Sequence, residues 1–98
     1  MSDLTLEHQP RDHDGAFVLL RDGQKLGEMH YRRLGPNLIN IDHTQTDESL
    51  RGQGAARRLL DTAVAWARET RTQVKATCPY AKAQFQKDHS IQDVLAPP

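Results

Sequence analysis

Short apolar runs separated by turn residues fill the first half of the chain. Runs at 16–20, 25–34 and 38–46 are rich in residues that favour a pleated strand, whereas the residues before them are polar and end in a turn. Asp22-Gly23, between the first two runs, is typical of a type I′ turn, which needs a positive φ at both central positions. Gly35-Pro36-Asn37 separates the second run from the third. The pattern predicts three antiparallel strands joined by tight turns.

The second half of the chain begins with a helical period. Apolar residues recur three and four positions apart, at Ala56, Leu59, Leu60, Ala63, Val64 and Ala67. This period predicts an amphipathic helix over about 54–69, with its apolar stripe on the sheet. Residues 73–78 alternate and predict a fourth strand, parallel to the third because a crossover helix joins the two. Pro79 is expected to begin a second helix that continues to Lys87, because its missing N–H is harmless at the first helical position.

These elements together predict the α+β fold class. We expect a small, mostly antiparallel twisted sheet of about four strands, with a parallel pair near its end, and two main helices. Ninety-eight residues fit a single domain, 1–98, in which 1–14 and 96–98 are candidate flexible ends.

Composition narrows the class of partner. Lysine plus arginine and aspartate plus glutamate number thirteen each, and a net charge of zero argues against a nucleic-acid partner. The single cysteine, Cys78, and five histidines without ligand spacing predict neither a disulfide nor a metal site. A free thiol suits a reducing compartment, and the chain has neither a signal-peptide pattern nor a run of roughly 20 apolar residues to span a bilayer. We therefore expect a cytoplasmic protein with no membrane partner.

The strongest chemical signal is the segment Arg51-Gly52-Gln53-Gly54-Ala55-Ala56, predicted between a strand end and a helix start. Helix N-termini present unpaired N–H groups and a positive dipole, and small residues let the backbone approach a phosphate. Arg51 adds a charge-assisted contact. A tight turn without a ligand is the alternative at this stage. The segment lacks the Lys-Ser/Thr of a Walker loop and the third glycine of a Rossmann loop.

This segment is similar to the pyrophosphate loop of the GNAT acetyltransferases, commonly written Gln/Arg-x-x-Gly-x-Gly/Ala. Arg51, Gly54 and Ala56 occupy its three defined positions. The pieces 41–46, 50–56 and 78–80, in that order, resemble the short, single-domain YjdJ-type branch of the family. The resemblance covers approximately residues 15–95 and implies a trimmed acetyltransferase fold.

The resemblance implies a binding site for acetyl-CoA, without a metal. The backbone at Gly52, Gln53, Gly54, Ala55, Ala56 and Arg57 would hold the pyrophosphate of coenzyme A, together with Arg51. The pantetheine arm would run along the edge of the third strand at Thr44, Gln45 and Thr46. The acetyl thioester would then point towards the middle of the sheet.

Two residues are candidates for the chemistry. In the YjdJ-type branch a cysteine at the place of Cys78 lies near the thioester, and a helix N-terminus favours a thiolate. An inert core thiol is the equal alternative. His43 is predicted on the strand face of Ile39 and Ile41, opposite Asp42, where it is either a general base or a structural residue. Tyr80 is expected to pack its ring against the core.

The leading hypothesis is an N-acetyltransferase that transfers acetyl from acetyl-CoA to an unknown amine, directly or through Cys78. Larger family members carry extra helices between their first two strands. In this chain only the Asp22-Gly23 hairpin is predicted in that region. An open acceptor side follows, which favours a protein or peptide acceptor. A non-catalytic acyl-CoA-binding or protein-interaction module is the alternative, motivated by the lack of a carboxylate base beside His43.

Overall fold

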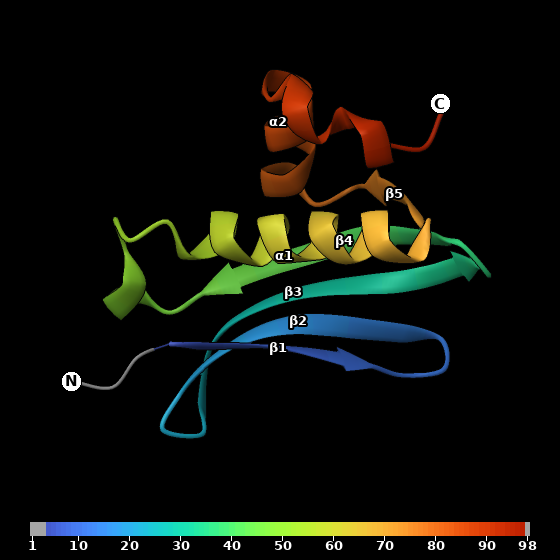
Figure 1. The fold of residues 1–98 in the computed structure, drawn as a ribbon. Coiled ribbons are helices and arrows are strands. Elements are labelled where there is room, and N and C mark those ends of the chain that lie inside the picture. Colours follow the sequence, from blue (N-terminus) through green and yellow to red (C-terminus); the bar gives the residue numbers. More distant parts are fainter. Residues whose placement is uncertain (1–3, 98) are drawn as a thin grey trace.

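The protein forms one five-stranded sheet with its helices on one face, as described for residues 4–97 by a computed structural model (Figure 1). The spatial order of the strands is β1-β2-β3-β4-β5; β4 and β5 are parallel and the other neighbours antiparallel. The elements are β1 (Thr5–Pro10), β2 (Asp14–Arg21), β3 (Gln24–Gly35), β4 (Leu38–Thr46), the 3-10 helix η1 (Glu48–Leu50), α1 (Ala55–Thr70), β5 (Gln73–Ala76), α2 (Pro79–Lys87) and the 3-10 helix η2 (His89–Val94).

The predicted α+β class is confirmed, and the β4 and α2 bounds are those expected. The sheet has one strand more than the approximate four, because β1 pairs with β2 along its whole length. The expected fourth strand ends at Ala76, so Cys78 lies outside it as the N-cap of α2. Of the candidate flexible ends, residues 1–3 and 98 lie outside the described residues, whereas Ala96 donates a backbone hydrogen bond to Val74.

The hairpin between β2 and β3 has the expected turn chemistry. Asp22 has a φ of 52° and Gly23 a φ of 79°, so both central residues are left-handed. A type I′ turn matches the right-handed twist of the strands that it joins, and this fixes which residues of β2 and β3 face each other.

No helix in the described part of the chain is long and apolar enough to cross a membrane.

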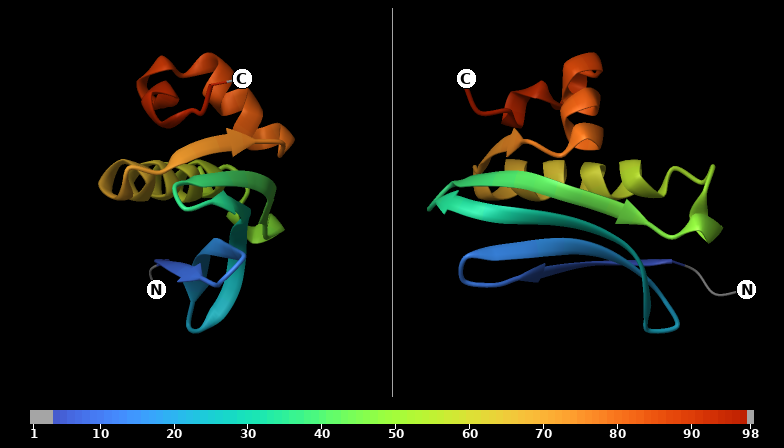
Figure 2. Two further views of the ribbon diagram at one scale, coloured as in Figure 1. Left: turned by 90° about the vertical axis from the view of Figure 1, so that its right-hand side faces the viewer. Right: turned by 180° about the vertical axis from the view of Figure 1, so that it is seen from behind.

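Helices α1 and α2 and the helix η2 share one face of the sheet. Helix α1 contacts β2, β3 and β4, and α2 lies over β4 and β5. Salt bridges hold these helices side by side, from Arg57 to Asp88 and from Arg68 to Asp93. The view from behind in Figure 2 shows the strands in front, with no helix of the described residues crossing them. We call this side the open face.

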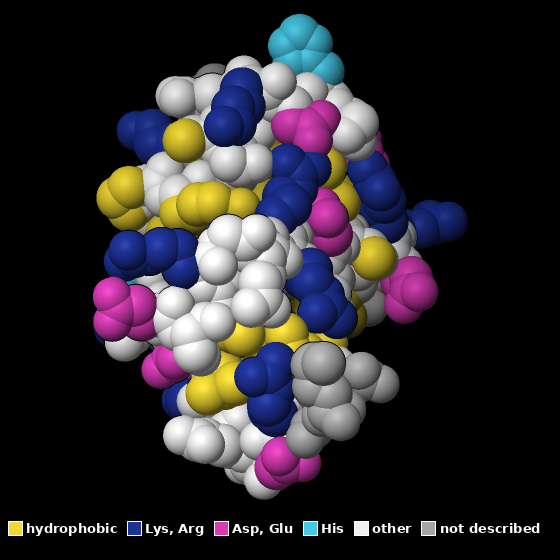
Figure 3. Space-filling view, turned by 90° about the vertical axis from the view of Figure 1, so that its left-hand side faces the viewer, with side chains coloured by type: hydrophobic (Ala, Val, Ile, Leu, Met, Phe, Trp, Pro, Cys, Tyr) yellow, Lys and Arg dark blue, Asp and Glu magenta, His cyan; other side chains and the backbone are white. Residues whose placement is uncertain are grey.

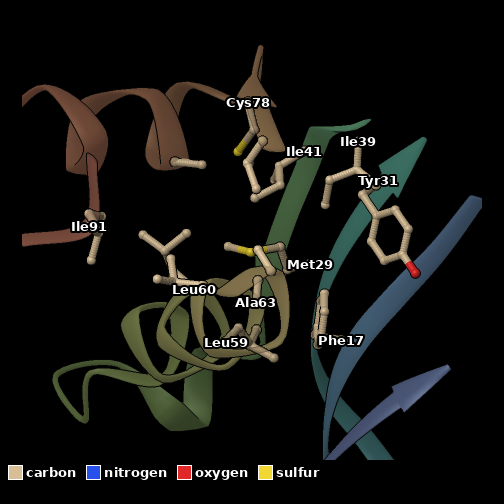
Figure 4. Close-up of a cluster of buried hydrophobic side chains, with 14 of the residues drawn as sticks. Phe17, Met29, Tyr31, Ile39, Ile41, Leu59, Leu60, Ala63, Cys78 and Ile91 are labelled. Carbon is tan, nitrogen blue, oxygen red and sulfur yellow. The ribbon is translucent and has the colours of Figure 1, made fainter. Parts of the chain in front are cut away.

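The core fills the space between the sheet and the helices (Figure 4). Tyr31 and Phe17 are fully buried sheet residues, and half-buried Trp66 on α1 packs against both rings. His8 joins β1 to this group: its ring stacks on Phe17 at 4.2 Å, and its Nε2 lies 2.7 Å from the Tyr31 hydroxyl. Burial and the Arg33 charge lower the pKa of His8, which favours the neutral ring that such packing requires. The strand β1 is therefore anchored by an imidazole together with Leu6, which packs against the same core.

An apolar residue on the open face is buried although no helix of the described residues packs against it. Val18 alternates with the core residues of β2 and has 0% exposure, yet it lies outside the core cluster. In the strand register Glu7 and Glu28 flank it from β1 and β3. Cross-strand neighbours stand close enough for long side chains to cover a small one. Polar side chains therefore shield this part of the sheet.

We predict that Gly15→Ala destabilises the fold by about 1–3 kcal/mol, because overpacking a filled core has a cost of this size. A Cβ on Gly15 would lie 2.4 Å from the Tyr31 hydroxyl oxygen, and that ring is held by His8 and Phe17. Chemical denaturation followed by the fluorescence of the single tryptophan measures the change.

Gly35→Ala is the matched control, because its Cβ would approach nothing closer than 3.9 Å and the φ of Gly35 is not left-handed. An equal loss of stability in the two variants would contradict the packing argument.

Candidate functional site

The predicted phosphate loop lies between the end of β4 and the start of α1. Gly52 and Gly54 have φ values of 79° and 67°, which non-glycine residues rarely adopt. The first helical hydrogen bond of α1 runs from the Arg58 N–H to the Gly54 carbonyl at 3.0 Å. The Gln53 N–H donates to the Leu50 carbonyl at 3.1 Å, whereas the N–H groups of Ala55, Ala56 and Arg57 precede the helical ladder and are directed out of the helix end. Two left-handed glycines thus lead into a helix end whose first N–H groups lack helical partners.

The charge around this helix end is unusual. Gly54, the N-cap of α1, has no side chain to cap the helix, and the first turn carries no acidic residue. Arginines stand there instead, although cations near a helix N-terminus cost about 0.3–1 kcal/mol each. Arg51 is 81% exposed and lies 3.5 Å from Glu48, which leaves it open to a ligand. An anion bound at the loop would satisfy both the dipole and Arg51.

The side chain of Arg57 has a structural role outside the loop. Its guanidinium donates to Asp61 at 2.8 Å, to Gln84 at 2.7 Å and to Asp88 of the α2 C-cap. The hydrogen bonds to Asp88 and Asp61 raise the pKa of Arg57, and the same contact lowers the pKa of Asp88 to about 2. The Arg57 side chain therefore ties α1 to α2, and only its backbone N–H belongs to the loop.

Strands β4 and β5 separate before β4 reaches this loop. Their register ends at Ile41 and Ala76, and the Ile41 carbonyl accepts hydrogen bonds from both Thr77 N–H, at 3.0 Å, and Cys78 N–H, at 3.1 Å. Beyond this point β4 continues to Thr46 while paired only with β3. The edge that carries Thr44, Gln45 and Thr46 is therefore free of β5, and it leads from the separation point to the loop.

A β-bulge in β4 decides which way the candidate residues face. His43 is the partner of His30 and Ile41 is the partner of Tyr31, so Asp42 is an extra residue in β4. The extra residue shifts by one the alternation of β4 side chains between the two faces of the sheet. The prediction that His43 shares the face of Ile41 is therefore wrong. His43 is exposed, with its ring 3.4 Å from the Gln45 amide oxygen.

Asp42 is also on the open face, since its carboxylate lies 2.6 Å from His30 Nδ1. The expectation that Asp42 and His43 lie on opposite faces is therefore wrong as well. His30 also contacts Asp14, at 2.8 Å. Sequence reasoning did not single out this contact, because it joins three strands and no local pattern reports it. Within the described residues, no group of His, Cys, Asp and Glu side chains is arranged to hold a metal ion.

Cys78 lies on the helix side of the sheet. It is 3% exposed, belongs to the core cluster and donates from Sγ to the Thr44 hydroxyl at 3.2 Å. The structure thus brings Cys78 to one candidate pantetheine residue, Thr44, but leaves His43 on the opposite face. Tyr80 packs against the same core, and burial raises the pKa of its phenol.

The surface around these residues carries mixed charge. Figure 3 views the molecule from the end at which the loop lies, and it shows Lys and Arg side chains scattered over the surface rather than gathered in one patch. A hollow of about 630 Å³ lies elsewhere, between β5, α2 and the segment 95–97. None of the candidate site residues lines this hollow.

Comparison with known proteins agrees with this geometry. A sequence model of the family described as GCN5-related N-acetyl-transferase matches residues 16–94. A GCN5-like protein from Staphylococcus aureus shares 35% identity and a TM-score of 0.71, over 95% of this chain and 90% of that chain. No curated protein matches the chain.

Two larger enzymes share the fold at lower identity. The ribosomal-protein-alanine N-acetyltransferase of Brucella melitensis biovar Abortus 2308 has 19% identity and a TM-score of 0.63, with 90% of this chain and 65% of that chain covered. Tetrahymena GCN5 has 15% identity and a TM-score of 0.65, with 79% and 51% covered. The chain thus spans about half to two-thirds of these enzymes.

A sheet that opens between two parallel strands beside an uncapped helix end defines a protein of the acetyltransferase class. The chain belongs to the GCN5-related N-acetyltransferase family. The resemblance drawn from the sequence is confirmed, and with it the enzyme class. Acetyl-CoA is the cosubstrate of this family.

We predict that Asp88→Asn lowers stability at neutral pH, because it removes the carboxylate that anchors Arg57. The pKa of Asp88 is depressed to about 2 in the folded protein, against about 4 when unfolded, so its contribution is complete above about pH 4 and is lost as the pH falls towards 2. Thermal unfolding of both proteins between pH 2 and pH 7 should show their difference shrinking in that window. A constant difference would contradict the assignment, and Asp12→Asn, an exposed site in the β1–β2 turn, is the control.

Proposed function

We propose that the protein transfers an acetyl group from acetyl-CoA to an amine, with the loop at Gly52–Arg57 as its coenzyme A site. The observation that carries this proposal is the end of α1, where left-handed glycines, no side-chain cap and no acidic residue leave backbone donors open beside Arg51. Because the chain belongs to an acetyltransferase family, the anion proposed for this site is the pyrophosphate of coenzyme A. A tight turn alone would not account for the charge of Arg58 at the positive end of a helix, whereas Arg57 is held there by Asp61 and Asp88.

The pantetheine arm has a path in this proposal. From the loop it runs along the edge of β4 past Thr46, Gln45 and Thr44, where β5 has separated. The arm can replace β5 as the hydrogen-bonding partner of that edge. The acetyl thioester then lies near Ile41 and the bulge, where β4 and β5 meet.

The acceptor amine approaches from the open face in this proposal. Its nitrogen attacks the thioester carbonyl carbon, the new C–N bond forms as the C–S bond breaks, and the proton released by the nitrogen is transferred to solvent or to the departing thiolate. His43 and Asp42 lie on this face, so a histidine and a carboxylate both stand where that proton is released. No helix within residues 4–97 covers this side, which favours the exposed amine of a protein or peptide as acceptor.

A route through Cys78 has less support. In it the Cys78 thiol loses its proton, the thiolate attacks the thioester carbonyl carbon, and coenzyme A leaves as a thiolate that takes up a proton; the amine then attacks S-acetyl-Cys78, whose thiolate leaves. Cys78 is buried in the core and separated by the sheet from His43, so no base among the candidates can deprotonate it. The non-catalytic alternative also weakens, because its motive was an Asp42 turned away from His43.

We predict that acetyl-CoA shifts the backbone amide signals of Gly52–Arg57 and that Arg51→Ala weakens its affinity about three- to tenfold, the size of one exposed charge-assisted contact. Isothermal titration calorimetry and amide spectra measure the two effects. Lys87→Ala, an exposed cation in the last turn of α2, is the matched control and should bind normally. Unmoved signals for the loop at millimolar acetyl-CoA would overturn the cofactor site.

We predict that no acetyl group accumulates on Cys78 when the protein is incubated with acetyl-CoA, because the thiol is buried and bonded to Thr44. Mass spectrometry of the intact protein, before and after addition of amines, tests this. An added acetyl group in the natural protein that is missing in Cys78→Ala would establish the covalent route instead.

A further inference from the structure

A row of alternating charges crosses the open face beside the β4 bulge. Asp14 on β2 accepts from Arg11 at 2.9 Å and lies 2.8 Å from His30 Nε2 on β3. The other ring nitrogen, Nδ1, lies 2.6 Å from Asp42 on β4, and Arg32 lies 3.5 Å from the second oxygen of Asp42. One imidazole therefore bridges carboxylates on both neighbouring strands.

This geometry requires a charged ring. A neutral imidazole has one N–H and one lone pair, so it can satisfy only one of two carboxylates. The imidazolium donates to both. Partial burial opposes the charge, but the hydrogen bonds to Asp14 and Asp42 outweigh it and raise the pKa of His30. The Arg11 and His30 hydrogen bonds hold the pKa of Asp14 well below its ordinary range, so this carboxylate is ionised near neutral pH.

Asp42 is the extra residue of the bulge, and the bulge decides how the next residues face. With it, Thr44 meets Cys78 on the helix side and His43 faces the open side. Without it, the alternation of a regular strand would exchange these two residues. An extra residue in a strand has no ladder partner of its own, so a side-chain contact that holds it has a direct effect on the local structure.

We propose that protonated His30 is a positioning residue of the acetyl-transfer site, which holds the β4 bulge in place by clamping Asp42. The proposal rests on the proposed function only in its last step, namely that the thioester lies at the bulge. His30 touches neither coenzyme A nor acceptor in this role. It fixes the backbone at 42–44, and so the position at which the acetyl group is held.

The proposal has a pH signature. A histidine with a raised pKa stabilises the local structure fully below the free value of about 6.5, and this stabilisation is lost as the pH rises through the higher folded value. Neutral His30 would turn a lone pair towards one of its carboxylates. The other charged or titratable groups facing this row are Arg11, Glu28, Arg32 and His43, and of these His43 is the cross-strand partner of His30.

The first experiment follows the amide signals of Asp42 and Thr44 between pH 5 and pH 9, in a His43→Gln background so that the neighbouring ring contributes nothing. Both signals should titrate with a midpoint above 6.5, the free-histidine value. Adding His30→Gln should abolish the titration, Asp14→Asn should lower its midpoint, and His89→Gln, at an exposed site on η2, should leave it unchanged. Signals that do not titrate, or that titrate without His30, would overturn the proposal.

The second experiment compares the dissociation constants of coenzyme A and acetyl-CoA by calorimetry. Because the loop is distant from the bulge, His30→Gln should leave coenzyme A binding within about twofold and weaken the preference for acetyl-CoA over coenzyme A by roughly tenfold, the effect of one lost charged contact. If the natural protein binds neither compound, the proposed function fails while the amide titration still decides the role of His30. If His30→Gln retains the full acetyl preference, the positioning role is overturned and the coenzyme A site stands.

Discussion

The packing of α1 against the sheet is the constraint on which the rest of the structure depends. Six residues of α1 are buried (Ala55, Leu59, Leu60, Ala63, Val64 and Ala67), and each fully buried leucine contributes roughly 2 kcal/mol relative to an exposed one. This contact fixes the N-terminus of α1 just beyond the end of β4. It also positions Arg57 so that α2 can be attached through Asp88. The loop, the free edge of β4 and the place of Cys78 all follow from that one interface.

The elements with strong local signals could be predicted from the sequence. The Asp22-Gly23 turn, the α1 period and the start of α2 at Pro79 each depend on residues close together in the chain, so pattern reasoning found them. The loop glycines were also recognised, because positive φ at a helix start is a local property. The strand β1 was missed because its inward positions are filled by few aliphatic residues and by His8, whose partner Tyr31 is 23 residues away.

The errors at the site have one physical origin. A strand pattern assumes that each residue alternates, and a single extra residue reverses every face that follows. No sequence pattern near Asp42 predicts the bulge, because the bulge is defined by how β4 pairs with β3. His43 and Asp42 were therefore assigned to the wrong faces, and the role of Arg57 was missed because its partners Gln84 and Asp88 lie 27 and 31 residues away.

The open face has a consequence for how this small protein tolerates change. Val18 is as buried as any core residue, and Glu7 and Glu28 flank it from β1 and β3. The hydrocarbon stem of a long polar side chain can cover a small apolar residue, as a second layer of helices does in a thicker protein. Surface positions here are then under the same steric selection as interior ones. A family drifting in sequence would keep long side chains at these sites while their charge varied freely.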